Sequence, residues 1–152
     1  MIRVQEQAFD AGAELMKLKA AKPQVGGTAL FVGSVRGNTD GAAIAAMTLE
    51  HYPGMTEKAL DTIESEARAR WALEDVLIIH RFGRLLPTDD IVLVICTSVH
   101  RDAAFAACQF LMDWLKTKAP FWKLEENSDG AEWVEAKTSD DAAAARWDAE
   151  KS

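Results

Sequence analysis

Two apolar runs rich in β-branched residues follow one another between two segments of helical periodicity, and this order constrains the fold most. The runs are Val76–Arg81 and Ile91–Ser98, joined by a loop containing Pro87–Thr88–Asp89–Asp90. Two strands without a helix between them pair most simply as antiparallel neighbours. The pattern therefore favours an α+β fold with a mixed, largely antiparallel sheet and flanking helices over a regular alternation of strand and helix.

Both helices are predicted from apolar spacing and boundary residues. The first follows the turn at Pro53–Gly54, with Thr56 as the expected N-cap. The second is expected from about Ala103 to Lys118, capped by Asp102 and stopped by Pro120. The first helix is expected to cover a sheet with an apolar face made of Leu60, Ile63, Ala67 and Trp71.

Further strands are expected on both sides of this central pattern, namely Thr28–Val35 after Gly26–Gly27, Ile44–Tyr52, the extended segment Phe121–Glu125, and Glu132–Lys137. An alanine-rich helix is expected around Asp140–Trp147. A length of 152 residues with 49% hydrophobic content suits one core. We expect a single domain over residues 1–152, with residues 1–25 and 140–152 least defined by the sequence.

The chain is acidic, with 24 acidic against 17 basic side chains and a net charge of -7. This balance disfavours nonspecific binding to nucleic acid or to an anionic membrane surface. No apolar run reaches the roughly 18 residues of a membrane span, and the N-terminus lacks a signal-peptide pattern. We expect a cytoplasmic protein that binds any anionic ligand through a local cluster of basic residues.

Cysteine and histidine are too sparse to predict a metal site. Cys96 and Cys108 lie in apolar runs and are expected to be small buried residues. The three histidines are scattered, and no metal or cofactor is expected. His51 is expected to pack the turn before Pro53, whereas His80–Arg81, with Arg84, forms either a second basic patch or a solvated strand end.

Five basic residues are candidates for an anion site, and two of them are lysines. Lys116 and Lys123 bracket the segment KTKAPFWK, in which Pro120 turns the chain, so both amines can reach one cleft; alternatively they only complement the helix dipole. Phe121 and Trp122 can shield an amine from water.

Arg36 and His100–Arg101 extend the candidate site. Arg36 ends FVGSVRG, where a guanidinium can bind phosphate in bidentate fashion, or the flanking glycines only form a turn. His100–Arg101 precede a helix, whose positive end attracts anions, although Arg101 can equally pair with Asp102. We expect these basic residues to gather at one anion-binding site.

Taken together, these segments resemble the large-subunit (MoaE) family of molybdopterin synthase, the enzyme of molybdenum cofactor biosynthesis. The resemblance rests on blocks that occur in order: FVGSVRG (Phe31–Gly37), LEHYPGMTEKAL (Leu49–Leu60), IIHRFG (Ile78–Gly83), SVHRDAAF (Ser98–Phe105), KTKAPFWKLE (Lys116–Glu125) and WVEAK (Trp133–Lys137). The first 25 residues and the tail match weakly.

The resemblance implies an α/β-hammerhead-type fold and a catalytic sulfurtransferase subunit. It further implies a heterotetramer, in which a central homodimer carries a small ubiquitin-like partner at each end. The Gly-Gly C-terminus of that partner bears a thiocarboxylate, which gives its sulfur to cyclic pyranopterin monophosphate, and two such transfers make the dithiolene of molybdopterin.

The resemblance also implies roles for single residues. Lys116 and Lys123 match the two essential lysines of the family, and His100–Arg101 match a pair contributed across the dimer. The substrate-binding set it implies is Ser34, Val35, Arg36, His100, Arg101, Leu124, Glu125 and Lys137. Ser34 is expected to act mainly through its backbone, and Lys137 stands where relatives have arginine, so it brings charge without a bidentate fork.

Two rival interpretations stay open from the residues alone. An acidic α+β domain with a basic cleft also suits a noncatalytic, oligomeric anion- or nucleotide-binding module. A transferase that used Cys96 or Cys108 as its sulfur carrier would instead need an exposed thiol in an electropositive setting.

Overall fold

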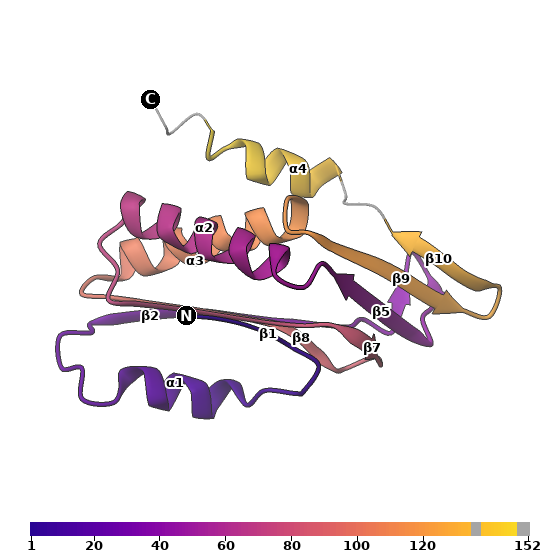
Figure 1. Cartoon of the computed structure of the whole chain (residues 1–152), viewed down its shortest axis with the longest axis horizontal. Helices are drawn as coiled ribbons and strands as arrows, with labels where there is room; N and C mark the ends of the chain where they lie inside the picture. The colour runs from indigo at the N-terminus through magenta and orange to yellow at the C-terminus, as the bar shows by residue number, and fades with distance from the viewer. Residues whose placement is uncertain (135–137, 149–152) are drawn as a thin grey trace.

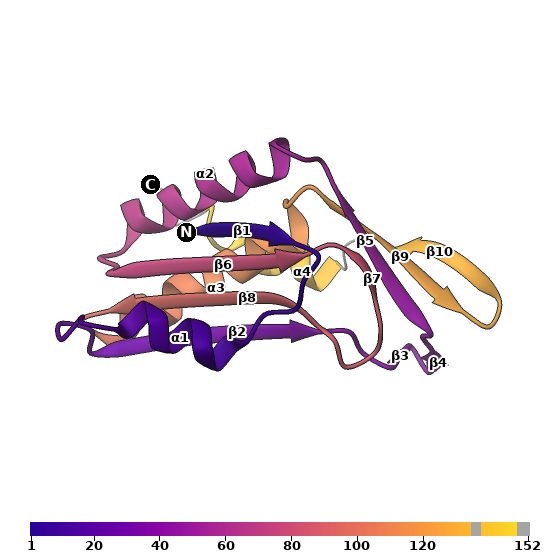
Figure 2. The ribbon, with the colours of Figure 1, turned by 60° about the horizontal axis from the view of Figure 1, so that its bottom comes forward.

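A computed structural model describes residues 1–134 and 138–148, and its main feature is a four-stranded mixed sheet. The strand order is β1-β6-β8-β2, where the strands are β1 (Ile2–Gln5), β6 (Asp75–Arg81), β8 (Asp90–Ser98) and β2 (Gly27–Ser34). Figure 2 shows the strands side by side, with β1 parallel to β6 and the other neighbours antiparallel. The two central runs pair antiparallel, which agrees with the mixed, largely antiparallel sheet that the sequence predicted.

Helices cover both faces of this sheet. Helix α1 (Ala11–Lys19) lies on one face, and α2 (Met55–Arg70) and α3 (Arg101–Thr117) lie on the other, with α4 (Thr138–Ala145) stacked on α3 (Figure 1). Side chains of β8 alternate between the two layers, because successive residues of a strand point to opposite faces. Leu93 and Ile95 pack toward α1, whereas Val92, Val94 and Cys96 pack toward α2 and α3.

A second, antiparallel sheet adjoins one end of the first. Its order is β10-β9-β5-β7, where the strands are β10 (Gly130–Val134), β9 (Phe121–Asn127), β5 (Ala46–His51) and β7 (Gly83–Leu85). A hairpin of β3 (Asn38–Thr39) and β4 (Ala42–Ala43) completes this end. The α+β prediction is confirmed, with the described strands distributed over two four-stranded sheets and the β3–β4 hairpin, and with β7 in the segment predicted as a loop.

Both predicted helix caps are wrong by two residues. Helix α2 begins at Met55 after Gly54, whose φ of 86° suits glycine, and Thr56 lies inside the helix, fully buried. Helix α3 begins at Arg101 after an extended His100, and Asp102 lies in the first turn. There its carboxylate complements the positive helix end without capping it.

The chain termini differ most from the expectations. The first 25 residues, least defined by their sequence, form β1 and α1. A four-residue edge strand carries too little periodicity to be predicted, and its place is fixed by parallel pairing with β6. At the other end, β10 begins at Gly130 and is described to Val134, so the last residues of the predicted strand Glu132–Lys137 lie outside the described part of the chain.

The Thr56 hydroxyl joins the start of α2 to the turn before β9. It accepts a hydrogen bond from the Tyr52 amide (3.1 Å) and donates one to the Pro120 carbonyl (3.2 Å). We expect Thr56→Val to lower the free energy of unfolding by about 1–3 kcal/mol, because it leaves two backbone groups without this partner. Urea denaturation measures the loss. Thr62→Val, at an exposed helix position, is the control, and equal stability of the two variants would contradict the role of Thr56.

Candidate active site

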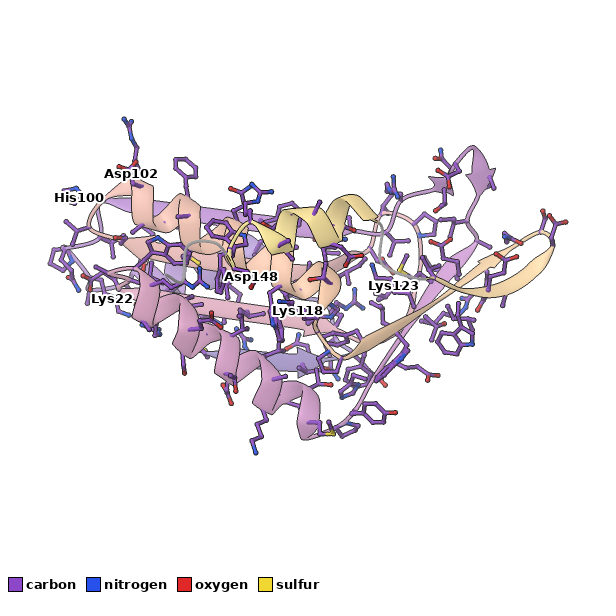
Figure 3. All side chains as sticks on the ribbon, turned by 90° about the horizontal axis from the view of Figure 1, so that it is seen from above. Lys22, His100, Asp102, Lys118, Lys123 and Asp148 are labelled. Carbon is purple, nitrogen blue, oxygen red and sulfur yellow. The ribbon has the colours of Figure 1, made fainter. Side chains whose placement is uncertain are left out.

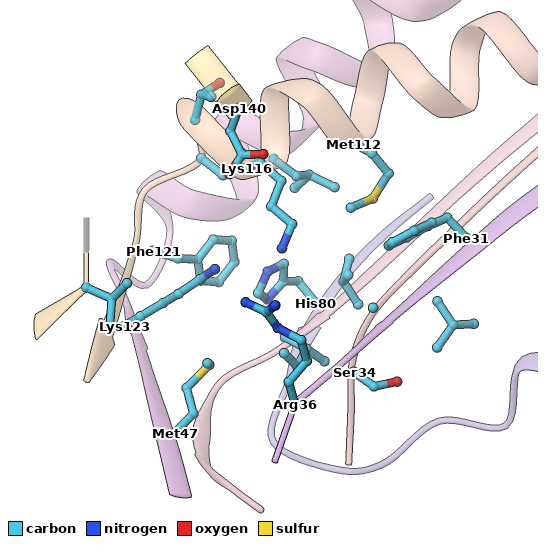
Figure 4. Close-up of a pocket in the computed structure, with 18 of the residues that line it drawn as sticks. Phe31, Ser34, Arg36, Met47, His80, Met112, Lys116, Phe121, Lys123 and Asp140 are labelled. Atoms are coloured by element: carbon cyan, nitrogen blue, oxygen red, sulfur yellow. The ribbon is translucent and has the colours of Figure 1, made fainter. Parts of the chain in front are cut away.

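A pocket of about 500 Å³ lies where the two sheets meet beneath the C-terminal end of α3. Its walls come from the end of β2 and the residues after it, from β6, from the last turns of α3, and from β9. Figure 4 shows the side chains of Lys116, Lys123 and Arg36 pointing into this pocket around the ring of His80. Three of the predicted basic residues therefore meet in one chain.

The end of α3 and the turn after it place the two lysines. Lys116 lies in the last turn of the helix, which ends when the Lys118 amide bonds to the Trp114 carbonyl (2.8 Å). The chain turns at Pro120 and enters β9, in which Lys123 faces the same pocket. The prediction that this turn brings both amines to one cleft is confirmed.

Arg36 reaches the pocket from the opposite wall. The register of β2 against β8 shifts between Gly33 and Ser34, and Arg36 follows on the exposed segment after the strand. Within the described part of the chain, the side chains of Arg36 and Lys116 make no hydrogen bond and no ion pair. A guanidinium and an amine that converge without a carboxylate partner form an attractive site for an anion.

Two uncharged or acidic side chains of the pocket wall, Ser34 and Glu125, make hydrogen bonds within the protein. The Ser34 hydroxyl donates to a carboxylate oxygen of Asp90 (2.7 Å), so its side chain is tied to β8. Glu125 lines the pocket and accepts a hydrogen bond from the Thr39 hydroxyl (3.3 Å). Glu125 of β9 and Asp140 of α4 are thus two acidic groups in the same wall.

His80 lies in the pocket wall and was missed as a candidate site residue. It belongs to β6, is 7% exposed, and stacks on Phe121 with ring centroids 3.7 Å apart. Burial, assisted by the charges of Lys123 and Lys116, lowers the pKa of His80 to about 4. The interpretations of His80 as part of a basic patch or a solvated strand end are both wrong, and its position after the apolar run Val76–Ile79 was the available signal for burial.

His100 and Arg101 lie far from this pocket in the same chain. They mark the start of α3, and Lys116 follows Arg101 by fifteen helical residues, which corresponds to about 22 Å along the axis. Figure 3 shows His100 at one end of the molecule and Lys123 well separated from it, beyond the other end of α3. The expected basic site is therefore not completed by this pair within one chain, whereas their contribution across a dimer, which the resemblance implies, stays a prediction.

Close backbone packing fixes the loop that carries His100 and Arg101. The Gly26 amide donates to the Ser98 carbonyl (3.0 Å), and a Cβ on Gly26 would lie 2.1 Å from the Val99 carbonyl oxygen. Only glycine fits this approach without a shift of the backbone. The glycines that open β2 therefore hold the start of α3 against the sheet.

The remaining implied substrate ligands lie in varied places. The Val35 side chain is buried in the core with Met47, and its amide and carbonyl bond to the backbone of the Pro87–Asp90 segment. Leu124 is half-buried and alternates with the pocket-facing neighbours on β9, which directs it to the other face of that sheet. Lys137 lies outside the described residues.

The two aromatic residues beside Lys123 separate to opposite faces. Phe121 lines the pocket and covers His80. Trp122 is 40% exposed and makes an edge contact with Tyr52, with ring centroids 4.5 Å apart. Of the two predicted shields for an amine, only Phe121 belongs to the pocket.

Both cysteines are buried between the main sheet and α3, as predicted. Contact with Cys108 and burial raise the pKa of the Cys96 thiol. Neither thiol lines the pocket among the described residues. A sulfur-carrying role for these cysteines therefore lacks the exposed, electropositive setting that a reactive thiolate needs.

The described residues contain no group of three His, Cys, Asp or Glu side chains arranged to hold a metal ion. In the same part of the chain, no helix has both the length and the apolar character needed to cross a membrane.

Comparisons with known proteins agree with this geometry. A family model described as MoaE protein matches residues 4–118. The molybdopterin synthase catalytic subunit of Ralstonia nicotianae is 56% identical over 146 residues, which are 96% of this chain and 83% of that protein. The molybdopterin synthase catalytic subunit of Pseudomonas aeruginosa is 55% identical over 147 residues, which are 97% of this chain and 98% of that protein. The solved MoaE protein from Burkholderia ambifaria has a TM-score of 0.83 at 55% identity, with 97% of each chain covered. The chain therefore belongs to the MoaE family, as its sequence motifs predicted.

Proposed function

We propose that this chain is the catalytic subunit of a molybdopterin synthase. It transfers sulfur from the C-terminal thiocarboxylate of a small ubiquitin-like partner to cyclic pyranopterin monophosphate. The observation that carries the proposal is the convergence of Arg36, Lys116 and Lys123 in one pocket, where Arg36 and Lys116 have no anionic partner among the described residues. Its family membership and relatives named as catalytic subunits support the same reaction.

The charge arrangement suits two anions that must meet. The substrate carries a phosphate and the partner's tail carries a thiocarboxylate, and they repel one another in water. Three cations in one pocket offset this repulsion and hold the reacting groups in place. Arg36 is assigned to the phosphate because its planar fork matches phosphate oxygens, and the two lysines are assigned to the tail and the reacting centre.

A sulfur supplied by the partner also explains the placement of the cysteines. Cys96 and Cys108 are packed in the core, away from the pocket. The chain itself then contributes binding, orientation and proton transfer, while the reactive sulfur arrives on the thiocarboxylate.

A homodimer completes the proposed site. His100 and Arg101 lie at the far end of α3 from Lys116, so within one chain they cannot bind the same small substrate. In a twofold dimer the start of α3 from one copy faces the pocket of the other, which brings a second set of cations to the substrate. The small partner then occupies each outer end, which gives a heterotetramer.

Removal of either lysine tests the reaction. We expect Lys116→Ala and Lys123→Ala each to lower turnover by about 100-fold or more, since each removes a charge aimed at the reacting groups. Molybdopterin formation from cyclic pyranopterin monophosphate and the thiocarboxylated partner is measured. Lys118→Ala, at the same helix end but on the opposite side, is expected to keep the wild-type rate. Absence of product with wild-type protein would favour a noncatalytic anion-binding module.

Replacement of Arg36 tests the phosphate assignment. We expect Arg36→Ala to raise the KM for the pterin substrate by about 10- to 100-fold, as expected for loss of a charge-assisted hydrogen bond. Arg36→Lys should recover only part of this loss, because an amine lacks the bidentate fork. Arg84→Ala, which breaks a surface pair with Glu126, is the control. An unchanged KM in Arg36→Ala would remove the phosphate role.

Mixed dimers test whether His100 and Arg101 act across the subunits. Arg101→Ala and Lys116→Ala homodimers are each expected to be nearly inactive. After the two are unfolded and refolded together, half of the dimers carry one intact site, so activity should return to about a quarter of the wild-type rate. Recovery is measured against separately refolded controls. A mixture no more active than its parents would place Arg101 and Lys116 outside a shared site.

A further inference from the structure

His80 is held rigidly in the wall of the proposed sulfur-transfer pocket. Its Nδ1 lies 2.8 Å from the Arg81 carbonyl oxygen, and its ring stacks on Phe121 at an interplanar angle of 16°. On the sheet, it faces Val4 of β1 and Val92 of β8 across the two neighbouring strands. The imidazole is therefore fixed in orientation by a hydrogen bond on one side and by an aromatic ring on its face.

The hydrogen bond also fixes which nitrogen carries the proton. A carbonyl oxygen only accepts, so Nδ1 must donate, and Nε2 of the neutral ring keeps its lone pair. Within the described part of the chain, Nε2 of His80 has no hydrogen-bond partner. Among the same residues, Nε of Arg3 is the one fully buried side-chain nitrogen or oxygen that lacks a partner, so Nε2 of His80 is not fully buried. Nε2 thus keeps contact with the pocket space that its ring lines.

Burial, reinforced by the surrounding positive charges, keeps this imidazole neutral until an anion binds. Burial is the main cause that lowers the pKa of His80 to about 4. The hydrogen bond to Arg81 opposes this shift, and the charges of Lys123, Lys116 and His51 add smaller decreases. The titratable groups around it are Lys116 of α3, Lys123 and Glu125 of β9, His51 of β5, Arg36 after β2, Asp140 of α4 and its own neighbour Arg81. Bound anions offset the cations and return the pKa of His80 toward its ordinary value.

Sulfur transfer from a thiocarboxylate creates a need for such a group. The sulfur bonds to a carbon of the pterin substrate as an oxygen substituent leaves that carbon with its electron pair, and the tail and the substrate are then joined as a thioester. Release requires a water oxygen to attack the acyl carbon, after which the carbon–sulfur bond breaks and its electron pair stays on sulfur. A base must take the proton of the attacking water, because neutral water is a weak nucleophile.

We propose that His80 is a further catalytic residue, whose Nε2 takes the proton from the water that releases the acyl group of the partner's tail. The tail leaves as a carboxylic acid that ionises, and the proton on Nε2 passes to the thiolate left on the pterin, which restores the neutral ring. This role rests on the proposed function of the chain. Arg36, Lys116 and Lys123 hold the anions while His80 moves the proton.

Two substitutions separate proton transfer from mere packing. Asn can replace the hydrogen bond that Nδ1 makes, and Gln places an amide near Nε2, but neither side chain titrates. We expect His80→Asn and His80→Gln each to lower turnover by about 100-fold. In both variants the covalent adduct of partner and pterin should accumulate, detected by intact mass. His51→Gln, which also lies beside Phe121 but does not line the pocket, should turn over without the adduct.

The pH profile gives a second readout. A base works only when deprotonated, so wild-type turnover should fall as the pH drops through the pKa of His80 in the loaded site, and this acidic limb should vanish in both His80 variants. Wild-type rates in His80→Gln, or an acidic limb that persists in the variants, would overturn the proposal. Failure of the wild-type protein to form product would instead overturn the proposed function.

If the variants do not fold, an NMR titration of the wild-type complex tests the role of His80. The imidazole of His80 is followed by NMR with and without saturating inorganic phosphate, which stands for the anionic substrate. Bound phosphate is expected to move its pKa from about 4 to above about 5, because the anion offsets the neighbouring cations. A pKa that stays the same with phosphate bound would show that bound anions do not raise the basicity of His80 and would overturn the proposal.

Discussion

The packing of α3 on the main sheet is the constraint on which the rest of the molecule depends. Its apolar stripe, with Ala104, Ala107, Cys108 and Leu111 at its centre, is buried against β2, β8 and α2. A helix fixed along its whole length also fixes both of its ends. Lys116 is thereby held over the pocket, while His100 and Arg101 are held about 22 Å away. The same rigid helix that builds one half of the proposed site places the other half on a second copy.

The charge distribution follows from the need to bind anions on an acidic protein. With a net charge of -7, the chain has no long-range attraction for an anion, so binding depends on a few cations placed together. Three of them line one pocket, and among the described residues two are left without carboxylate partners. A buried imidazole among these cations remains neutral, because burial and neighbouring positive charge both disfavour its protonated form.

Most of the fold was predictable because its elements are periodic, and the errors have local physical causes. The strands β2, β6 and β8 and the helices α2 and α3 carry long apolar patterns, and Pro120 marks the turn that brings Lys116 and Lys123 together. Helix starts depend on single φ angles and side-chain bonds, so Thr56 and Asp102 were misplaced as caps. His80 was misjudged because its partner ring, Phe121, is 41 residues away, and only the tertiary fold joins them.

The position of the turn at Pro120 links stability to chemistry. The Thr56 hydroxyl bonds to the Pro120 carbonyl, and the next residue, Phe121, covers the ring of His80. One short segment therefore sets the angle between α3 and β9, and hence the separation of the two lysines, and it also shields the imidazole from water. A displacement of this segment would change charge placement and proton transfer together, which explains why a buried threonine on α2 belongs to the same physical unit as the pocket.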